Sequence, residues 1–204
     1  SAINMARVFL QEKMSNVVNA YPWNMFDYYK AETLDTDYPK YIESGNAVEL
    51  CKQIEKNNTV ILCPYEYSVT VGGLPVLPML FWEELVKKLK QSGYCVVTNC
   101  KGDSIEQPIK GTEKIFPAFG DIESVLSYAG NVIGVRSGFF DYAARADAKK
   151  VVLYPTEFFH NKWSIKQIWK AENTEEFVYS AYLSDNQIEA LIKQIINNIV
   201  VEQR

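Results

Sequence analysis

The sequence has a single histidine and no closely spaced cysteine pair, and these two shortages exclude the common zinc sites. His160 cannot supply the two imidazole ligands that many metal centres need. None of the four cysteines forms a C-x-x-C pair, and Cys63 and Cys95 lie in apolar runs, where a thiol acts as a small hydrophobic group. We therefore expect reduced cysteines, a cytoplasmic protein and no bound metal.

The chain also has no surplus of positive charge and no long hydrophobic run. It contains 21 basic and 25 acidic residues, for a net charge of -4. This balance argues against a nucleic-acid partner, because neutralising phosphates requires clustered lysine and arginine. No apolar stretch approaches the roughly 18 to 20 residues that span a bilayer, and the first residues lack the pattern of a signal peptide. We expect no transmembrane segment and no secretion signal.

Two familiar nucleotide-binding fingerprints are missing as well. Neither G-x-G-x-x-G nor G-x-x-x-x-G-K-[ST] occurs anywhere in the sequence. This argues against an ordinary NAD-binding domain and against a P-loop. A small phosphorylated ligand is still allowed, because it needs only a few well-aimed donors.

The composition that remains is that of a globular protein, and it changes character near residue 46. Of the 204 residues, 48% are hydrophobic and 23% are charged. Residues 1–46 are rich in aromatics and turn formers and predict one helix, at 4–19, in an otherwise irregular segment. Its aromatic side chains could line a sugar subsite, or they could pack against the sheet or against a missing partner. Residues 47–204 predict one regular domain.

Short apolar runs alternate with amphipathic segments through this second region. Continuous apolar runs of five or six residues are typical of strands buried on both faces of a parallel sheet. Strands that alternate with helices predict an α/β, Rossmann-like domain of three layers with a mostly parallel sheet. The predicted strands are 59–63, 94–99, 114–116, 131–135 and 150–154, and the predicted helices are 47–56, 78–92, 121–129, 138–146 and 185–200.

The most informative stretch is the turn that follows the fourth predicted strand. Arg136, Ser137 and Gly138 stand between a buried strand and a helix. In an open parallel sheet, ligands bind beyond the carboxyl ends of the strands. Backbone N–H groups at a helix start attract anions, glycine lets a ligand approach the backbone, and arginine offers paired donors to phosphate. The turn is therefore a candidate phosphate site.

A purely structural interpretation of this turn is equally open. Ser137 could cap the helix, and Arg136 could pair with Asp141 or with Glu123. Other loops after strands add candidate ligand contacts. Ser68 and Thr70 could donate hydrogen bonds from their hydroxyls to the same anion, and Gly72-Gly73 could offer backbone amides. Asn99 could form hydrogen bonds with the edge of a base or with a ribose. Tyr65 and Tyr67 could stack on a ring of the ligand.

Residues 59–155 resemble the nucleotide-sugar-binding lobe of two-lobed, GT-B-type glycosyltransferases, in particular the heptosyltransferase-like group. The resemblance rests on four ordered features. A strand ends at Pro64 before a loop containing Ser68, and an amphipathic helix leads into SGYCVVTN. A short helix leads into GNVIGVRSG, and KKVVLYP then matches the last core strand of that lobe.

The resemblance implies roles for individual residues. In such enzymes the Ser-Gly turn and the following helix hold the donor phosphates, which here assigns Ser137, Gly138 and Phe139 to phosphate binding. Arg136 stands where the family has an acidic residue, and Asp141 stands in place of its downstream histidine. The candidate ligand-binding residues are Tyr67, Ser68, Asn99, Arg136, Ser137, Gly138, Phe139 and Asp141.

The implied function is binding of a nucleoside-diphosphate sugar for glycosyl transfer in polysaccharide or glycoconjugate synthesis, with no further cofactor. The expected partners are the nucleotide sugar, a glycan acceptor, and a second lobe or another copy of the chain. A second lobe is expected because the sequence predicts only one. Residues 1–46 would be a linker or a remnant of the missing lobe. Two alternatives are open. The chain could be a non-catalytic protein-interaction module that docks through its aromatic N-terminal region and its isoleucine-rich terminal helix, or a sugar-nucleotide epimerase.

Overall fold

The computed structural model describes residues 46–65, 74–179 and 183–200. The chain divides into two units, residues 1–40 and 41–204, and every described residue belongs to the second. The helix predicted at 4–19 lies outside the described residues.

The described unit is built on a six-stranded sheet in the order β3-β2-β1-β4-β5-β6. Every neighbouring pair of strands is parallel, so the prediction of an α/β, Rossmann-like domain is confirmed. This order is the one found in doubly wound nucleotide-binding domains. The strands are β1 (Thr59–Cys63), β2 (Cys95–Asn99), β3 (Glu113–Ile115), β4 (Gly130–Val135), β5 (Lys149–Tyr154) and β6 (Thr174–Val178).

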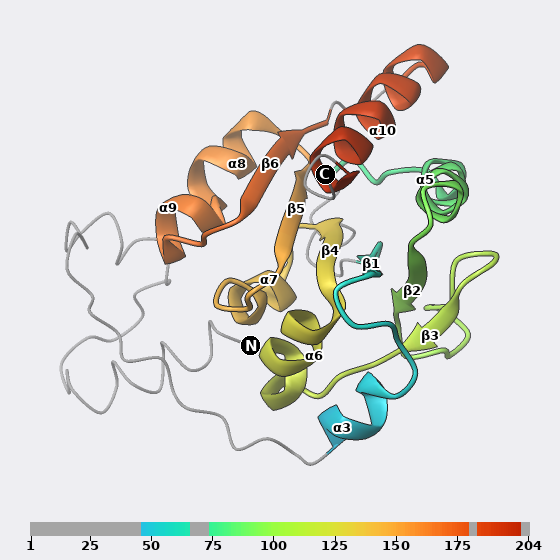
Figure 1. Cartoon of the computed structure of the whole chain (residues 1–204). Coiled ribbons are helices and arrows are strands. Elements are labelled where there is room, and N and C mark those ends of the chain that lie inside the picture. Colours follow the sequence, from blue (N-terminus) through green and yellow to red (C-terminus); the bar gives the residue numbers. More distant parts are fainter. Residues whose placement is uncertain (1–45, 66–73, 180–182, 201–204) are drawn as a thin grey trace, which may run out of the picture. The chain divides into compact units, whose positions relative to one another are not determined.

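Helices cover both faces of the sheet and complete three layers (Figure 1). On one face, α5 (Met79–Gln91) and α10 (Asp185–Val200) share a hydrophobic core with the strands. On the other face, residues of α3 (Asn46–Cys51), α6 (Ile122–Ala129) and α7 (Gly138–Ala143) pack into a second core. Within the described residues, no helix has the length and apolar character that crossing a membrane requires.

The apolar runs form strands because both faces of the sheet are covered. All five residues of β1 are buried. Val60 and Leu62 point into the core beneath α5 and α10, while Ile61 and Cys63 point into the opposite core. Alternate side chains of a strand face opposite sides, so a centrally placed strand must be apolar along its whole length.

Glycine ends two of the helices, while the start of α6 lacks a side-chain cap. Gly93 and Gly130 follow α5 and α6 with a φ of 90°, the left-handed conformation that favours glycine at a helix end. Asp121 stands at the cap position of α6, but its side chain makes no capping hydrogen bond. The helix instead continues directly from a single 3-10 turn, Phe119–Asp121.

Several predicted boundaries and elements need correction. The helix expected at 47–56 ends at Cys51, and the helix expected to reach residue 146 ends at Ala143. Strand β6 and the two short helices α8 (Glu157–Trp163) and α9 (Ile165–Trp169) were not predicted. Each of these helices begins with a side-chain cap, because Thr156 accepts a hydrogen bond from the Phe159 amide and Ser164 accepts one from the Gln167 amide.

Candidate ligand site at the carboxyl edge of the sheet

The strand order reverses between β1 and β4, which lie side by side at the centre of the sheet (Figure 1). The chain leaves β1 towards β2 on one side and leaves β4 towards β5 on the other. Their following segments therefore diverge, and the general rule for open α/β sheets places the ligand crevice beyond the carboxyl ends of these two strands. Such a switch point is where open α/β sheets bind ligands. The segment after β4 begins with Arg136, Ser137 and Gly138.

Close packing joins β1 and β4 beneath this crevice. A Cβ placed on Gly134 would lie 2.5 Å from the Cβ of Cys63 and 2.7 Å from its carbonyl oxygen, so only glycine fits. Asn99, at the end of β2, donates from Nδ2 to the Cys63 sulfur at 3.7 Å, which places this candidate residue beside the switch point. Burial, opposed by that hydrogen bond, raises the pKa of Cys63 to about 12, so the thiol cannot serve as a nucleophile at neutral pH.

Arg136 is buried, and each of its three side-chain nitrogens donates a hydrogen bond within the protein. Its Nη2 lies 2.5 Å from the Asp141 carboxylate, and its Nε donates to the Trp163 carbonyl at 2.9 Å. Its Nη1 donates to the carbonyl of Ser137. Only 6% of the Arg136 side chain is exposed. The interpretation in which Arg136 pairs with Asp141 therefore describes the structure, while Glu123 pairs with Arg145 at 3.9 Å.

Ser137 and Gly138 differ from Arg136 in having donors that the described part of the chain does not use. Ser137 has an extended backbone, with φ -145° and ψ 175°, and its side chain makes no capping bond to α7. The expectation that this hydroxyl caps the helix is therefore wrong. A Cβ built on Gly138 would meet no atom within 4 Å. The turn thus presents a hydroxyl and an open stretch of backbone at the crevice.

The next two candidates on α7 have mainly packing and pairing roles. Phe139 is half-buried and packs edge to face against Phe140, with ring centroids 5.8 Å apart. Asp141 accepts from Arg136 and, at 2.7 Å, from the indole Nε1 of Trp169. These two bonds to one carboxylate oxygen tie Asp141 to the protein.

The first loop of the crevice is described only in part. Tyr67 and Ser68, like Thr70 and Gly72-Gly73, lie outside the described residues. Tyr65, just before them, donates from its hydroxyl to the Gln107 carbonyl at 2.5 Å. The carboxyl edge of the sheet therefore contains Asn99, Arg136, Ser137, Gly138, Phe139 and Asp141 among the predicted site residues.

A stacked aromatic pair, Phe119 and Tyr142, was not predicted as part of the site. Phe119 stacks on Tyr142 of α7, with ring centroids 4.8 Å apart and an interplanar angle of 24°. Phe119 is nevertheless 56% exposed, and Phe116 is 53% exposed. Tyr142 lies about one helical turn beyond Gly138. The signal in the sequence was FPAF, which has one phenylalanine at the end of the predicted strand 114–116 and another three residues later, where loops of a parallel sheet meet ligands.

A buried carboxylate lies on β6, the strand at the opposite edge of the sheet from β3. Glu176 accepts hydrogen bonds from the hydroxyls of Tyr154 and Ser164, both at 2.7 Å, and from Nε2 of His160 at 3.1 Å. Burial alone would raise the pKa of Glu176, but these hydrogen bonds outweigh it and hold the pKa below its ordinary value. Ser164 and His160 both bond to the carboxylate, so they do not form the Ser-His relay of a nucleophilic triad.

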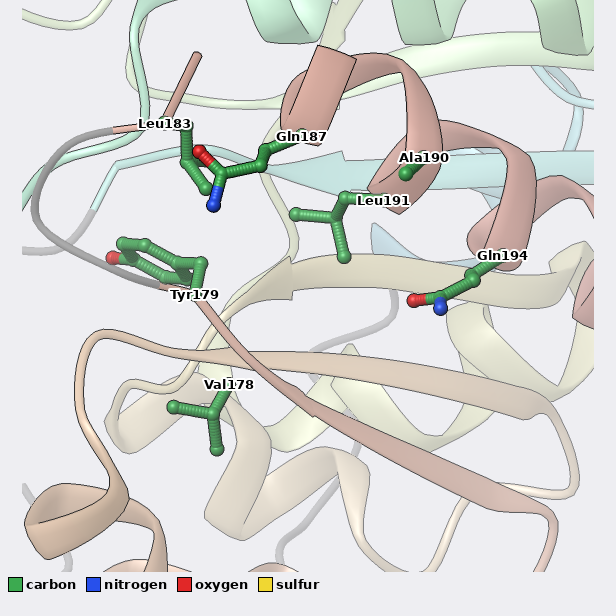
Figure 2. A pocket seen from close by; sticks show the side chains of 7 residues that line it. All are labelled: Val178, Tyr179, Leu183, Gln187, Ala190, Leu191 and Gln194. Carbon is green, nitrogen blue, oxygen red and sulfur yellow. The ribbon is translucent and has the colours of Figure 1, made fainter.

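An open groove of the described surface lies elsewhere, between the end of β6 and one side of α10. It has a volume of about 280 Å³, and Figure 2 shows Leu183, Gln187 and Leu191 projecting over the strand end that carries Tyr179. None of the candidate ligand residues lines it. Its lining is mostly apolar side chains and glutamine amides, without a charged group.

Comparison of the chain with protein-family models, with curated proteins and with solved structures gives no match.

Proposed function

We propose that residues 41–204 form a glycosyltransferase-type domain that binds a nucleoside-diphosphate sugar at the switch point between β1 and β4. The diphosphate would contact the hydroxyl of Ser137 and the backbone N–H groups of Gly138 and Phe139. Arg136 would hold the turn in shape, because its guanidinium is already bonded to Asp141 and to two carbonyl oxygens.

One observation carries the proposal. At the point where the strand order reverses, the described structure leaves the Ser137 hydroxyl without a capping role and Gly138 facing open space. The neighbouring charged groups are neutralised by each other. A turn that served only to start α7 would be expected to use its serine as the cap.

The stacked pair of Phe119 and Tyr142 supports a ligand that contains a flat ring. Phe119 packs on Tyr142 with one face and is otherwise exposed. Stacking of a nucleobase on such a ring contributes about 1–3 kcal/mol. The base would lie against Phe119 while the phosphates reach Ser137.

In this proposal the domain stabilises the leaving diphosphate and does not activate the acceptor. Hydrogen-bond donors aimed at the diphosphate lower the barrier to its departure. Asp141, the carboxylate nearest the turn, is bonded to Arg136 and Trp169 and is not placed to remove a proton. Deprotonation of a glycan hydroxyl would require a base supplied by a second lobe or a partner.

Calorimetry with UDP, GDP, ADP, CDP and their sugars tests the proposal. We expect one nucleoside diphosphate to bind, and Ser137→Ala to weaken it by about 1.5–3 kcal/mol, the range for a hydrogen bond to a charged group. Ser137→Asp is the sharper variant, because aspartate is a good helix cap yet repels phosphate. It should leave the melting temperature unchanged or higher while binding is lost.

Ser92→Ala serves as the matched control, since the exposed Ser92 hydroxyl bonds only to the last turn of α5, at Lys88. Its affinity should equal that of the wild type. Flat titrations of the folded wild-type protein with all the nucleotides would refute the proposal. Unchanged affinity in Ser137→Asp would refute the location of the site.

No observation raises either alternative above this proposal. The interaction module would dock through the isoleucine stripe of α10, but Leu191, Ile192, Ile195 and Ile199 are buried against the chain's own core. The aromatic N-terminal region lies outside the described residues. An epimerase would need acid–base groups that act on a sugar ring at this position. The carboxylate of Asp141 is bonded to Trp169, and the thiol of Cys63 is buried, so neither group is placed for that role.

A further inference from the structure

A chain of hydrogen bonds joins the edge strand β6 to the Ser137–Gly138 turn through helices α8 and α9. The helices reach the turn at two points. The Trp163 carbonyl, at the end of α8, accepts from Arg136 Nε at 2.9 Å, and Trp169, at the end of α9, donates to Asp141 at 2.7 Å. Neither tryptophan was a candidate site residue, and they lie 27 and 28 positions from their partners.

The Glu176 carboxylate fastens these helices to β6. One of its oxygens accepts from the Ser164 hydroxyl at 2.7 Å and from His160 at 3.1 Å. The other accepts from the backbone amide of Ile165 at 2.9 Å and from the Tyr154 hydroxyl. Ser164 ends α8 and caps α9, so one buried side chain sets the junction between the two helices.

Arg136 links the position of α8 and α9 to the backbone of the Ser137–Gly138 turn. Its Nη1 donates to the Ser137 carbonyl, which also accepts from the Phe140 amide at 3.0 Å. A trans peptide unit is planar, with its C=O and N–H pointing in opposite directions. Fixing the Ser137 carbonyl therefore fixes the direction of the Gly138 N–H, one of the donors that the proposed function assigns to phosphate.

Because the Arg136–Asp141 ion pair is buried, the conformation of the turn depends on the other hydrogen bonds that these two side chains make. The side chains of Arg136 and Asp141 are 6% and 15% exposed, so neither can exchange its partners for bulk water at little cost. Loss of the indole donor, or a shift of the Trp163 carbonyl, would leave one of the two charges short of a hydrogen bond. The guanidinium would then settle in more than one orientation, and the Ser137 carbonyl would move with it.

The geometry points to Trp169 and Glu176 as positioning residues for the Ser137–Gly138 turn: neither touches the ligand, and both hold the donors of the turn in one orientation. This inference rests on the proposed function for the identity of the ligand, while the ordering of the turn itself is measurable without one.

The test uses the full chain with two variants and two matched controls. Trp169→Phe removes the indole donor, and Glu176→Gln removes the charge that fastens α8 and α9. Trp163→Phe changes a tryptophan but keeps the backbone carbonyl that Arg136 uses, and Glu175→Gln neutralises the exposed neighbour of Glu176. The first readout is the ¹⁵N order parameter of Gly138 and Phe139 without ligand, and the second is affinity for the nucleoside diphosphate that the wild type binds best among UDP, GDP, ADP and CDP.

We expect order parameters of about 0.85 in the wild type and both controls, falling towards about 0.6 in Trp169→Phe and Glu176→Gln. Affinity should fall about tenfold in the same two variants, as expected when ordering of the site must accompany binding. If Glu176→Gln does not fold, Trp169→Phe carries the test, because it leaves the junction of α8 and α9 in place.

The outcomes separate the two proposals. A turn that stays equally ordered in Trp169→Phe overturns the positioning role, whatever happens to affinity. A turn that loosens in a protein whose wild type binds no nucleoside diphosphate supports the positioning role and refutes the proposed function. Loosening that is equal in Trp163→Phe and Trp169→Phe also overturns the inference, because it would reflect loss of packing and not loss of the hydrogen bond to Asp141.

Discussion

Gly134 and Gly138 lie four residues apart, and the structure assigns them opposite constraints. An added Cβ at Gly134 would overlap backbone and side-chain atoms of Cys63 and would come within 3.0 Å of the Phe140 ring. An added Cβ at Gly138 would meet nothing within 4 Å. The first glycine is required by the contact between β1 and β4, and the second leaves room at the surface of the turn.

Gly134→Ala should therefore destabilise the protein by about 1–3 kcal/mol, the usual cost of overpacking a filled core. Gly138→Ala should change stability by no more than about 1 kcal/mol, in either direction. Urea unfolding of the two variants against the wild type measures the difference. Equal stability of the two alanine variants would contradict the close contact between β1 and β4.

The acid stability of the protein should depend on Glu176, whose side chain is 7% exposed. Hydrogen bonds from Tyr154, Ser164 and His160 overcome the effect of burial and lower the pKa of this carboxyl in the folded state. A carboxyl with a lowered folded pKa stabilises the fold above its ordinary pKa. This stabilisation is lost as the pH falls through the folded pKa, because the unfolded chain takes up the proton first.

We expect Glu176→Gln to be less stable than the wild type by about 1–3 kcal/mol at pH 7. The difference should shrink as the pH is lowered from about 5 towards 3. Urea unfolding at a series of pH values gives this difference directly, with Glu175→Gln as the control that should follow the wild type. A difference that stays constant down to pH 3 would show that the charge of Glu176 is not what holds α8 and α9.

At the scale of elements, the central strands were predictable and the edge strand β6 was not. β1, β4 and β5 are covered on both faces, so each contains an apolar run of four residues, VILC, VIGV and VVLY. β6 has the sequence TEEFV, and its two glutamates interrupt the apolar pattern by which strands are recognised. The side chain of one of them, Glu176, points inward and accepts hydrogen bonds from α8 and α9. The pattern of polar and apolar residues does not predict these partners.

The candidate site, too, was predictable from the sequence in part only. Ser137 and Gly138 could be singled out because a strand turns into a helix at that position. The role of Arg136 was left between two interpretations, because its deciding partner, the Trp163 carbonyl, lies far along the chain and belongs to a helix that was not predicted. The loss of the expected serine cap depends on one backbone conformation, which composition and spacing do not determine.

The terminal helix α10 belongs to the core of the domain. Its isoleucines pack against α5 and the sheet, and the Tyr94 hydroxyl donates to the Ile199 carbonyl at 3.1 Å. Ile195→Ala should therefore cost about 2–5 kcal/mol, as for a large aliphatic side chain removed from a core. Asn197→Ala, on the exposed side of the same helix, should be nearly neutral. Thermal and urea unfolding check both, and a neutral Ile195→Ala would mean that the stripe is available to bind another protein.

At the scale of the whole molecule, the described unit has the covered sheet and the hydrophobic cores of a folded domain. Its sheet separates two hydrophobic cores, each closed by helices from the same unit. The switch-point residues from Asn99 to Asp141 and the positioning residues Trp169 and Glu176 all lie within residues 41–204. A chain of about 150 residues or more buries enough apolar surface to fold alone.

We therefore expect a fragment of residues 41–204 to unfold cooperatively in urea, with coincident transitions by circular dichroism and tryptophan fluorescence. If the site lies where we propose, the fragment should also bind the same nucleoside diphosphate as the full chain, and Ser137→Asp should abolish that binding in both. A bound ligand at 100 times its Kd should add about 2.7 kcal/mol of stability. A fragment that is compact but lacks a cooperative transition would refute independent folding of this unit. A cooperative fragment without affinity, where the full chain binds, would contradict a ligand site confined to residues 41–204.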